Sequence, residues 1–256
     1  MILIDTHTHI YSEKFDHDRD EVIQRAMDIG VQRFYLPSIN SSYYNKMEDL
    51  KNKYPENMFL MIGLHPCDVK SDTYEHELAF VENKLLEEKF AAVGEIGLDL
   101  YWDTTTLELQ KYAFIKQINL AKKFKLPIII HIRDAFKEAL EILEKEKDSD
   151  LYGIVHCFSG NLEQAKQFID LGFYLGIGGV VTFKNGKIDK FLKEIPLENI
   201  VLETDSPYLA PTPFRGKRNE SSYLKVIADK ISDIYELMPD EVGKITSENA
   251  RRIFNL

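Results

Sequence analysis

The chain of 256 residues is poor in cysteine and has no long hydrophobic run. Its two cysteines, Cys67 and Cys157, make no CxxC pair and no disulfide framework, which favours a reducing compartment. No stretch approaches the ~18 apolar residues that cross a bilayer, and the start of the chain has neither the basic region nor the cleavage site of a signal peptide. We therefore expect a soluble cytoplasmic protein with no membrane partner.

Positive charge is also scarce, because 42 acidic residues outnumber 32 Lys and Arg and leave a net charge of −10. The acidic residues are spread along helical stretches, so no global field attracts polyanions. This weighs against strong non-specific binding of nucleic acid, although a metal cluster and a few local cations can still hold phosphates. No Pro/Gly/Ser-rich linker divides the sequence, so we interpret residues 1–256 as one domain with no obligate protein partner.

Short apolar runs alternate strictly with helical patterns along the chain. The runs are typical of strands buried on both faces and lie near 2–5, 31–36, 58–63, 91–95, 127–131, 153–157, 173–177 and 200–204. The helical patterns are Arg19 to Ile29, Ser42 to Lys53, Tyr74 to Glu88, Leu107 to Lys125, Ala135 to Lys145, Leu162 to Leu171 and Ile188 to Lys193. This alternation predicts a (β/α)₈ TIM-type barrel. A final helical section, Glu220 to Tyr235 and Asp240 to Phe254, should pack on the outside of the barrel.

Histidines and carboxylates stand just after these apolar runs. Asp5-Thr6-His7-Thr8-His9 follows the first run, and the third, fourth, fifth, sixth and eighth strands end at His65, Glu95, His131, His156 and Asp205. In such a barrel the strand C-termini build the active site, so these side chains should meet at one face. The other two histidines, His17 and His76, stand in patterns typical of the surface.

This set of residues predicts a centre for two divalent ions, with zinc, manganese and magnesium as candidates. We assign His7, His9 and Asp205 to one ion and His131 and His156 to the other. Glu95 is expected to bridge both ions through its two carboxylate oxygens. Asp5 has two open interpretations, because it can orient a ligand histidine or cap the following loop.

Several segments, in order along the chain, resemble the signatures of TatD-family metal-dependent deoxyribonucleases, which belong to the amidohydrolase superfamily. The similarity spans the chain and rests on residues 5–9, 62–66, 93–99, 127–135, 156–160, 178–185, 203–211, 215–220 and 249–254. The resemblance implies a hydrolase of DNA phosphodiester bonds that depends on divalent metal ions. Physically, two ions lower the pKa of a water molecule and neutralise phosphate charge. Asp205 is then the candidate general base, with Glu95 holding the ions together.

Fewer residues are candidates for holding the substrate. His65 stands at a strand end, and Arg133 follows His131 by two residues, where its planar fork would suit a phosphate or pair with a nearby acid. Lys217 and Arg218 follow the Asp205 strand and form a possible phosphate latch. Glu203 should contact the nucleophile, the substrate or an additional ion, or else hydrogen-bond behind the ligands. Tyr101-Trp102 either stacks on a base or packs in its loop.

Two other function classes stay open. A hydrolase of a small amide, lactone or phosphate ester fits the acidic net charge, because barrels of this superfamily support many chemistries. Many such relatives bridge their metals with a carboxylated lysine at the fourth strand, where this chain has Glu95. A scaffold without catalysis is disfavoured because every expected ligand is present.

Overall fold

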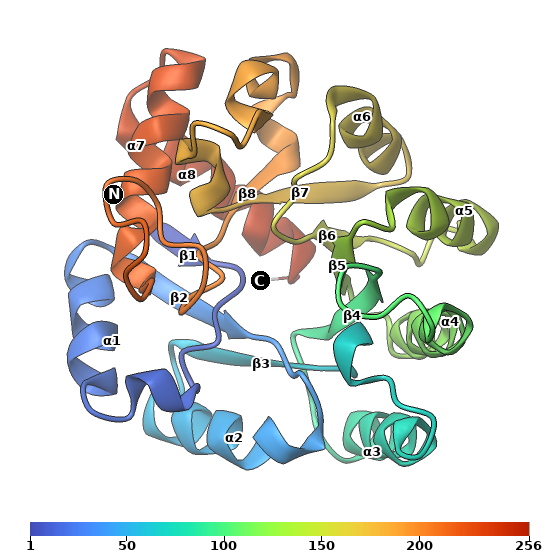
Figure 1. Cartoon of the computed structure of the whole chain (residues 1–256). Helices are drawn as coiled ribbons and strands as arrows, with labels where there is room; N and C mark the ends of the chain where they lie inside the picture. Colours follow the sequence, from blue (N-terminus) through green and yellow to red (C-terminus); the bar gives the residue numbers. More distant parts are fainter. Residues whose placement is uncertain (256) are drawn as a thin grey trace.

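The computed structural model describes residues 1–255 and shows parallel strands inside a ring of helices (Figure 1). The strands are β1 Leu3–Asp5, β2 Val31–Leu36, β3 Met58–Ile62, β4 Ala92–Asp99, β5 Ile128–Arg133, β6 Gly153–Val155, β7 Phe173–Ile177 and β8 Ile200–Leu202. Each strand pairs in parallel with the next one along the chain. A bridge from Thr8 to Ser206 and the 2.9 Å bond from the Asp205 amide to the His7 carbonyl join β8 to β1. The predicted (β/α)₈ barrel is confirmed.

Helices cover the outside of this barrel on all sides (Figure 1). They are α1 Arg19–Asp28, α2 Tyr44–Lys53, α3 Tyr74–Glu87, α4 Leu107–Phe124, α5 Phe136–Glu146, α6 Leu162–Asp170, α7 Leu224–Tyr235 and α8 Pro239–Ile253. The helix predicted at Ile188 to Lys193 is wrong. This segment forms two separate 3₁₀ turns, η5 Ile188–Lys190 and η6 Leu192–Glu194, because six residues make less than two turns of α-helix and Phe191, with φ −123°, interrupts them.

The inside of the barrel carries one apolar layer below the strand ends. Seven strands each contribute one buried side chain to it, namely Ile4, Tyr35, Met61, Ala92, Ile129, Ile154 and Val201. Ala250, Ile253 and Phe254 close this layer from below, and the Phe254 ring stacks on Tyr35 at 3.7 Å between centroids. The last residues that the structure describes therefore lie near the barrel axis (Figure 1). The sequence predicts that the final helical section packs on the outside of the barrel. Helix α7 lies there (Figure 1), whereas the end of α8 closes the bottom of the barrel.

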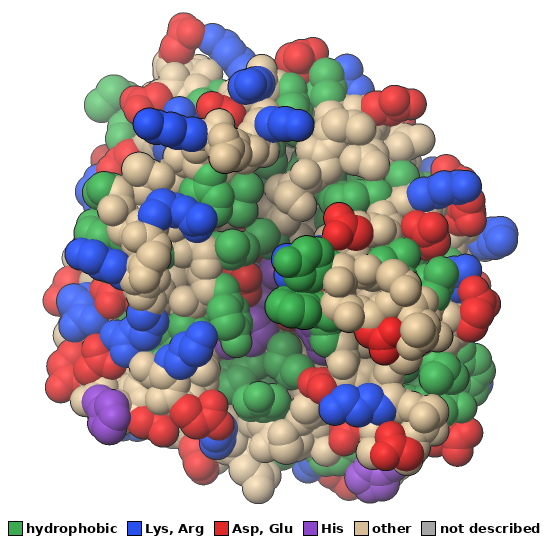
Figure 2. Space-filling view, viewed as in Figure 1, with side chains coloured by type: hydrophobic (Ala, Val, Ile, Leu, Met, Phe, Trp, Pro, Cys, Tyr) green, Lys and Arg blue, Asp and Glu red, His purple; other side chains and the backbone are tan. Residues whose placement is uncertain are grey.

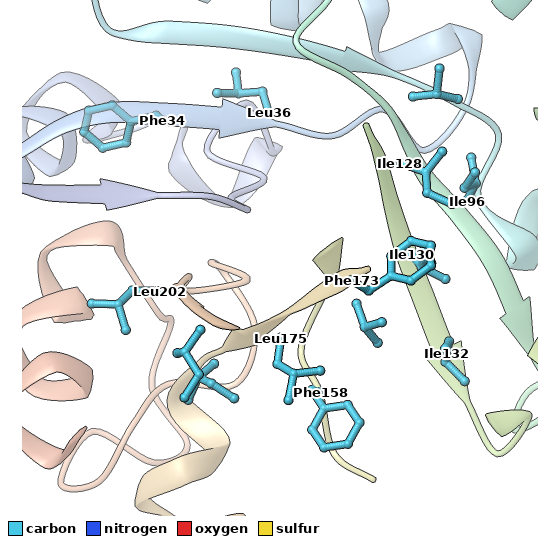
Figure 3. Close-up of a cluster of buried hydrophobic side chains, with 14 of the residues drawn as sticks. Phe34, Leu36, Ile96, Ile128, Ile130, Ile132, Phe158, Phe173, Leu175 and Leu202 are labelled. Atoms are coloured by element: carbon cyan, nitrogen blue, oxygen red, sulfur yellow. The ribbon is translucent and has the colours of Figure 1, made fainter. Parts of the chain in front are cut away.

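A second apolar layer lies between the strands and the surrounding helices. Figure 3 shows side chains from this layer, including Phe34, Ile128, Ile130, Phe173 and Leu175, which project from the outer faces of their strands. Side chains alternate across a strand, so the residues between them point into the barrel. Ile129 and Ile154 are inside, and His131 and His156, two residues further along, face the same interior one level higher.

Strand β4 is longer than the sequence suggested, because it continues past Glu95 to Asp99. The pairing of β4 with β5 shifts between Gly94 and Ile96 and then runs on to the pair Asp99–Arg133. Gly97 permits this extension, since it has φ +138° and a Cβ there would lie 2.1 Å from the His131 carbonyl oxygen. Glu95 therefore projects from within a strand rather than from its end.

Candidate metal centre

Glu95 lies at the centre of a cluster of imidazoles at the upper end of the barrel. Its side chain is 3% exposed. One carboxylate oxygen, Oε2, is 3.2 Å from His7 Nε2 and 3.7 Å from His9 Nε2. The other oxygen, Oε1, is 2.9 Å from His131 Nδ1 and 3.0 Å from His156 Nε2. The two oxygens thus face two different sets of nitrogens, in the division that the sequence predicted.

Asp205 completes the first of these sets. Its Oδ1 lies 3.4 Å from His9 Nε2 and 3.9 Å from His7 Nε2, and those two nitrogens are 3.3 Å apart. The Asp205 side chain is 13% exposed, so it is the ligand candidate in this set that reaches furthest toward solvent. Its left-handed backbone, φ 55°, turns the chain sharply after β8 and lets its amide bond the His7 carbonyl.

The remote ring nitrogens of three histidines face acceptors, so each ring can keep its proton on that side when a metal ion takes the inward nitrogen. Tyr11 donates its hydroxyl proton to the Pro37 carbonyl at 2.6 Å, so its oxygen accepts from His9 Nδ1 at 2.7 Å. His131 Nε2 faces Asp99 Oδ2 at 2.9 Å, and His156 Nδ1 faces Glu203 Oε1 at 3.3 Å. Each of these rings can therefore keep a lone pair on the nitrogen that points into the cluster, which is the form that binds a metal ion.

His65 has the opposite arrangement. Its Nδ1 accepts the Cys67 amide at 3.1 Å, so the lone pair of this ring lies away from the cluster. In the neutral ring the proton is then on Nε2, which is 3.2 Å from Glu95 Oε1. Although His65 is close enough to group with Glu95 and His131, it is built as a hydrogen-bond donor rather than as a ligand.

The carboxylates of the cluster need positive charge to balance them. Burial alone would raise the pKa of Glu95, but the surrounding imidazoles hold it well below its usual value. Burial alone would lower the pKa of His131 and His156, yet the neighbouring carboxylates raise both. Among residues 1–255, no Lys or Arg forms an ion pair with Glu95, Asp205 or Glu203. The balancing positive charge must come from protons on histidine or from a bound ion.

The donors fit divalent ions. By their distances, His7, His9, Glu95 and Asp205 would hold one ion, and His131, His156 and the second oxygen of Glu95 would hold another. Imidazole nitrogens with carboxylate oxygens suit zinc and manganese. The residues present therefore fit the metal centre that the sequence indicated.

Asp5 and Glu203 support the cluster from behind. Asp5 accepts the Thr204 hydroxyl at 2.7 Å and its amide at 3.0 Å, and it also lies 3.4 Å from the His7 amide. Burial raises the pKa of Asp5 to about 7, against hydrogen bonds that lower it. It thereby ties the end of β1 to the end of β8.

Glu203 is fully buried and accepts the Cys157 amide at 2.7 Å beside His156. Gly176 on β7 leaves the room for this carboxylate, because a Cβ there would lie 2.2 Å from Glu203 Oε2. Of the two interpretations given by the sequence, this placement fits the one in which Glu203 lies behind the ligands, because its carboxylate does not reach the open face.

The candidate substrate residues lie apart from one another. Arg133 is exposed and stacks on the Tyr101 ring at 3.6 Å, with Trp102 at 5.5 Å, and it forms no ion pair among residues 1–255. Lys217 is exposed on the loop after β8. Arg218 instead forms a double hydrogen bond to Asp18, at 2.7 and 2.6 Å, and a further one to the Lys14 carbonyl. A latch that includes Arg218 would have to break this pair.

Sequence reasoning missed two supporting residues, Asp99 and Tyr11. A signal for Asp99 was present, because a carboxylate four residues after Glu95 in an extended strand shares its face. Burial alone would raise the pKa of Asp99, but hydrogen bonds from His131 and the Tyr101 and Trp102 amides lower it to about 2. Tyr11 follows His9 by two residues, yet the sequence gave no sign that its hydroxyl would turn back to the ring.

Comparison with known proteins agrees with this centre. A family model described as TatD related DNase matches residues 4–255. The chain belongs to the TatD family. Within the TatD family, YabD from Bacillus subtilis, described as an uncharacterized metal-dependent hydrolase, is 42% identical over 256 residues and covers 100% of both chains. The chain is accordingly a metal-dependent hydrolase.

Solved structures of other proteins share the fold of this chain. The crystal structure of YjjV, a TatD homolog from Escherichia coli, has a TM-score of 0.92 and 30% identity, covering 99% of this chain and 98% of that one. The lactonase Lmo2620 from Listeria monocytogenes has a TM-score of 0.67 and 14% identity, covering 98% and 94% of the two chains, and shares the fold alone. Within residues 1–255, no helix has both the length and the apolar character needed to cross a membrane.

Proposed function

We propose that the chain hydrolyses phosphodiester bonds of DNA at this centre, using two divalent ions. The single observation that carries the proposal is the position of the Glu95 carboxylate, whose two oxygens face two separate sets of imidazole nitrogens. When bound, such ions lower the pKa of a water molecule and neutralise charge on the phosphate. The family model described as TatD related DNase supports the same substrate class.

The residues of the chain have separate tasks in this proposal. Asp205 is partly open to solvent beside His9 and is placed to take a proton from the attacking water. His65 presents its Nε2 proton beside Glu95 and would donate it to a phosphate oxygen as charge develops there. The carboxylates behind the ligands, Asp99 and Glu203, keep the His131 and His156 rings in the binding tautomer.

Arg133 would contact the DNA at the edge of the centre. Arg133 is exposed and its guanidinium stacks on the Tyr101 ring, and Trp102 is 70% exposed. Stacked cations of this kind suit a phosphate, while the exposed aromatic rings suit an unpaired base. Lys217 is a further candidate for a phosphate contact, since its side chain is exposed and forms no ion pair among the described residues.

A small-molecule hydrolase is the second candidate, favoured by the net charge of −10. A substrate panel separates the two functions. Labelled single-stranded and double-stranded DNA, a lactone and an organophosphate triester would each be assayed with zinc, manganese and magnesium. The proposal predicts that kcat/KM for DNA exceeds kcat/KM for the lactone and the triester with at least one metal. If kcat/KM were higher for the lactone or the triester than for DNA with every metal, the small-molecule hydrolase would replace the nuclease as the proposed function.

A further inference from the structure

A groove beside the metal centre gathers positive charge in an otherwise acidic protein. Its volume is about 1080 Å³, and its cationic side chains are Lys184, Lys187, Lys190 and Arg215. No Asp or Glu lines it, although acidic residues outnumber basic ones in the whole chain. We call this the basic groove.

The cations of the basic groove are available for a ligand. All four are exposed, and none of them forms an ion pair or a side-chain hydrogen bond among residues 1–255. Several other lysines and arginines of the protein are paired with an acid, as Lys193 is with Glu236. Arg215 is held in place by stacking on the Phe183 ring at 3.7 Å, which leaves the edges of its guanidinium to face an anion.

Three loops at the same end of the barrel as the metal centre form the walls. Ser159 and Asn161 follow β6, Lys184 and Lys187 follow β7, and Arg215 follows β8. Ser159 is three residues after His156, so the chain between them spans at most about 11 Å. Figure 2 shows Lys and Arg side chains gathered on the upper part of this face, with the histidines at the bottom of the central opening.

The walls are held together. Thr182 Oγ1, after β7, accepts the Thr212 amide at 2.8 Å, and the Thr212 hydroxyl donates to the Thr182 carbonyl at 3.2 Å. These bonds fix the Lys184 segment against the Arg215 loop. The groove is therefore a built surface rather than two loops that happen to lie near each other.

Its chemistry suits a single nucleic-acid strand. Phe136, Phe183 and Phe191 line the groove beside the cations and are partly exposed. Unpaired bases can pack on such rings while the phosphates meet the cations, whereas the bases of a duplex are turned inward and stacked on one another. The volume also exceeds the ~300–1,000 Å³ of typical small-ligand pockets.

We propose that the basic groove binds a single-stranded segment of the DNA substrate next to the bond that is cut. This inference rests on the proposed function, since the metal centre must act on the same strand. The groove then supplies affinity for a polymer that the net charge of the protein would repel. A substrate too short to enter the groove loses that contribution.

The test compares two triple variants that lose the same charge. The first combines Lys184→Ala, Lys187→Ala and Lys190→Ala. The control combines Lys89→Ala, Lys116→Ala and Lys244→Ala, which remove exposed lysines outside the groove that also lack ion pairs among residues 1–255. Binding of a fluorescent oligothymidylate of about 20 nucleotides would be measured against salt, in an Asp205→Asn background with metal present.

The groove triple should flatten the log–log salt slope by about 2.1, at about 0.7 per phosphate contact, and weaken binding up to about 100-fold at about 0.1 M salt. The control triple should bind close to the unsubstituted background. With Asp205 restored, the groove triple should also lower kcat/KM for the oligonucleotide relative to that for the 4-nitrophenyl ester of thymidine 5′-phosphate, which is too short to reach the groove.

The outcomes distinguish the groove proposal from the nuclease proposal. Equal binding by the groove and control triples, with the parent chain still cutting DNA, would overturn the groove and leave the nuclease standing. Binding that depends on the groove without any cleavage would keep the groove and overturn the nuclease. A parent chain that neither binds nor cuts the oligonucleotide would contradict both. Tighter binding of polyglutamate than of the oligonucleotide would contradict the assignment to nucleic acid.

Discussion

At the scale of single residues, the direction of one hydrogen bond separates ligands from donors. His9 and His131 turn their remote ring nitrogen to a hydrogen-bond acceptor, and His156 Nδ1 lies 3.3 Å from a Glu203 oxygen, whereas His65 accepts an amide at that position. All four imidazoles lie in one cluster, but only the first three can keep a lone pair turned inward. Judged by distance alone, His65 would count as a fifth imidazole ligand beside His7, His9, His131 and His156.

Glu95→Ala should lower the metal content of both halves of the centre, because the two carboxylate oxygens face different sets of nitrogens. His131→Ala should mainly empty the half that contains His156. Elemental analysis of purified, folded variants would measure both. Unchanged metal stoichiometry in Glu95→Ala would contradict the shared position of this carboxylate.

His65→Ala should retain its metal but lose about 10²–10³-fold in kcat, as expected when one donor to a developing charge is removed. His65→Gln, whose amide can donate, should recover part of the loss. Metal content and steady-state kinetics on DNA would be measured together. If His65→Ala lost one metal ion, His65 would be a metal ligand rather than a hydrogen-bond donor.

The sequence was sufficient to predict the barrel and the composition of the cluster, because both follow from regular patterns. Two-residue spacing along β5 carries Ile129 and His131 to the same interior. Asp99 was missed because the fourth strand was expected to end at Glu95, whereas the shifted pairing after Gly94 carries β4 on to Asp99. The partner of Arg218 was missed for another reason, since Asp18 lies 200 residues earlier in the chain.

At the scale of elements, ion pairs fasten the loop after β8 to the start of α1. Arg218 pairs with Asp18, the residue before α1, and Arg25 in α1 pairs with Glu220 at 2.8 Å. Hydrogen bonding to Arg218 lowers the pKa of Asp18 against the small effect of burial. These pairs tie the loop that follows Asp205 to α1 and to the residue before it.

Asp18→Ala and Arg218→Ala should each lower the free energy of unfolding by about 1 kcal/mol, the upper range for a partly exposed pair with good geometry. The double variant should lose little more than either single one, because both remove the same interaction. Lys217→Ala, on the same loop, is the control and should change stability by less than about 0.5 kcal/mol. Denaturant unfolding would measure all four proteins.

DNA affinity distinguishes this anchoring role from a phosphate latch. With an anchor, Arg218→Ala and Asp18→Ala should change affinity alike, since both release the loop. With a direct phosphate contact, Arg218→Ala should weaken binding and flatten the salt slope by about 0.7, while Asp18→Ala should not. The second pattern would restore Arg218 to the substrate site.

At the scale of the whole molecule, stability and chemistry occupy opposite ends of the barrel. The metal cluster lies at the C-terminal ends of the strands, and the apolar layer closed by Ile253 and Phe254 lies at the other end. This separation is typical of the fold and lets the loops at the upper end vary without disturbing the lower core.

Phe254→Ala should lower the free energy of unfolding by about 3 kcal/mol, because it removes a buried ring that stacks on Tyr35. Its kcat at a temperature where the protein is folded should match that of the parent. Met238→Ala, whose side chain is 71% exposed, is the control and should have little effect on either quantity. A large fall in kcat without a change in stability would show that the two ends are coupled.

The most direct test of a metal-dependent DNA hydrolase is single-turnover cleavage of end-labelled single-stranded DNA by the parent chain and by Asp205→Asn. The parent should cut with metal, stop after chelation and resume when metal is restored. Asp205→Asn should keep its fold and some metal but cut about 10²–10⁴-fold more slowly, the range for a general base. Cleavage that survives both chelation and Asp205→Asn, or no cleavage by a fully metallated parent, would contradict the account.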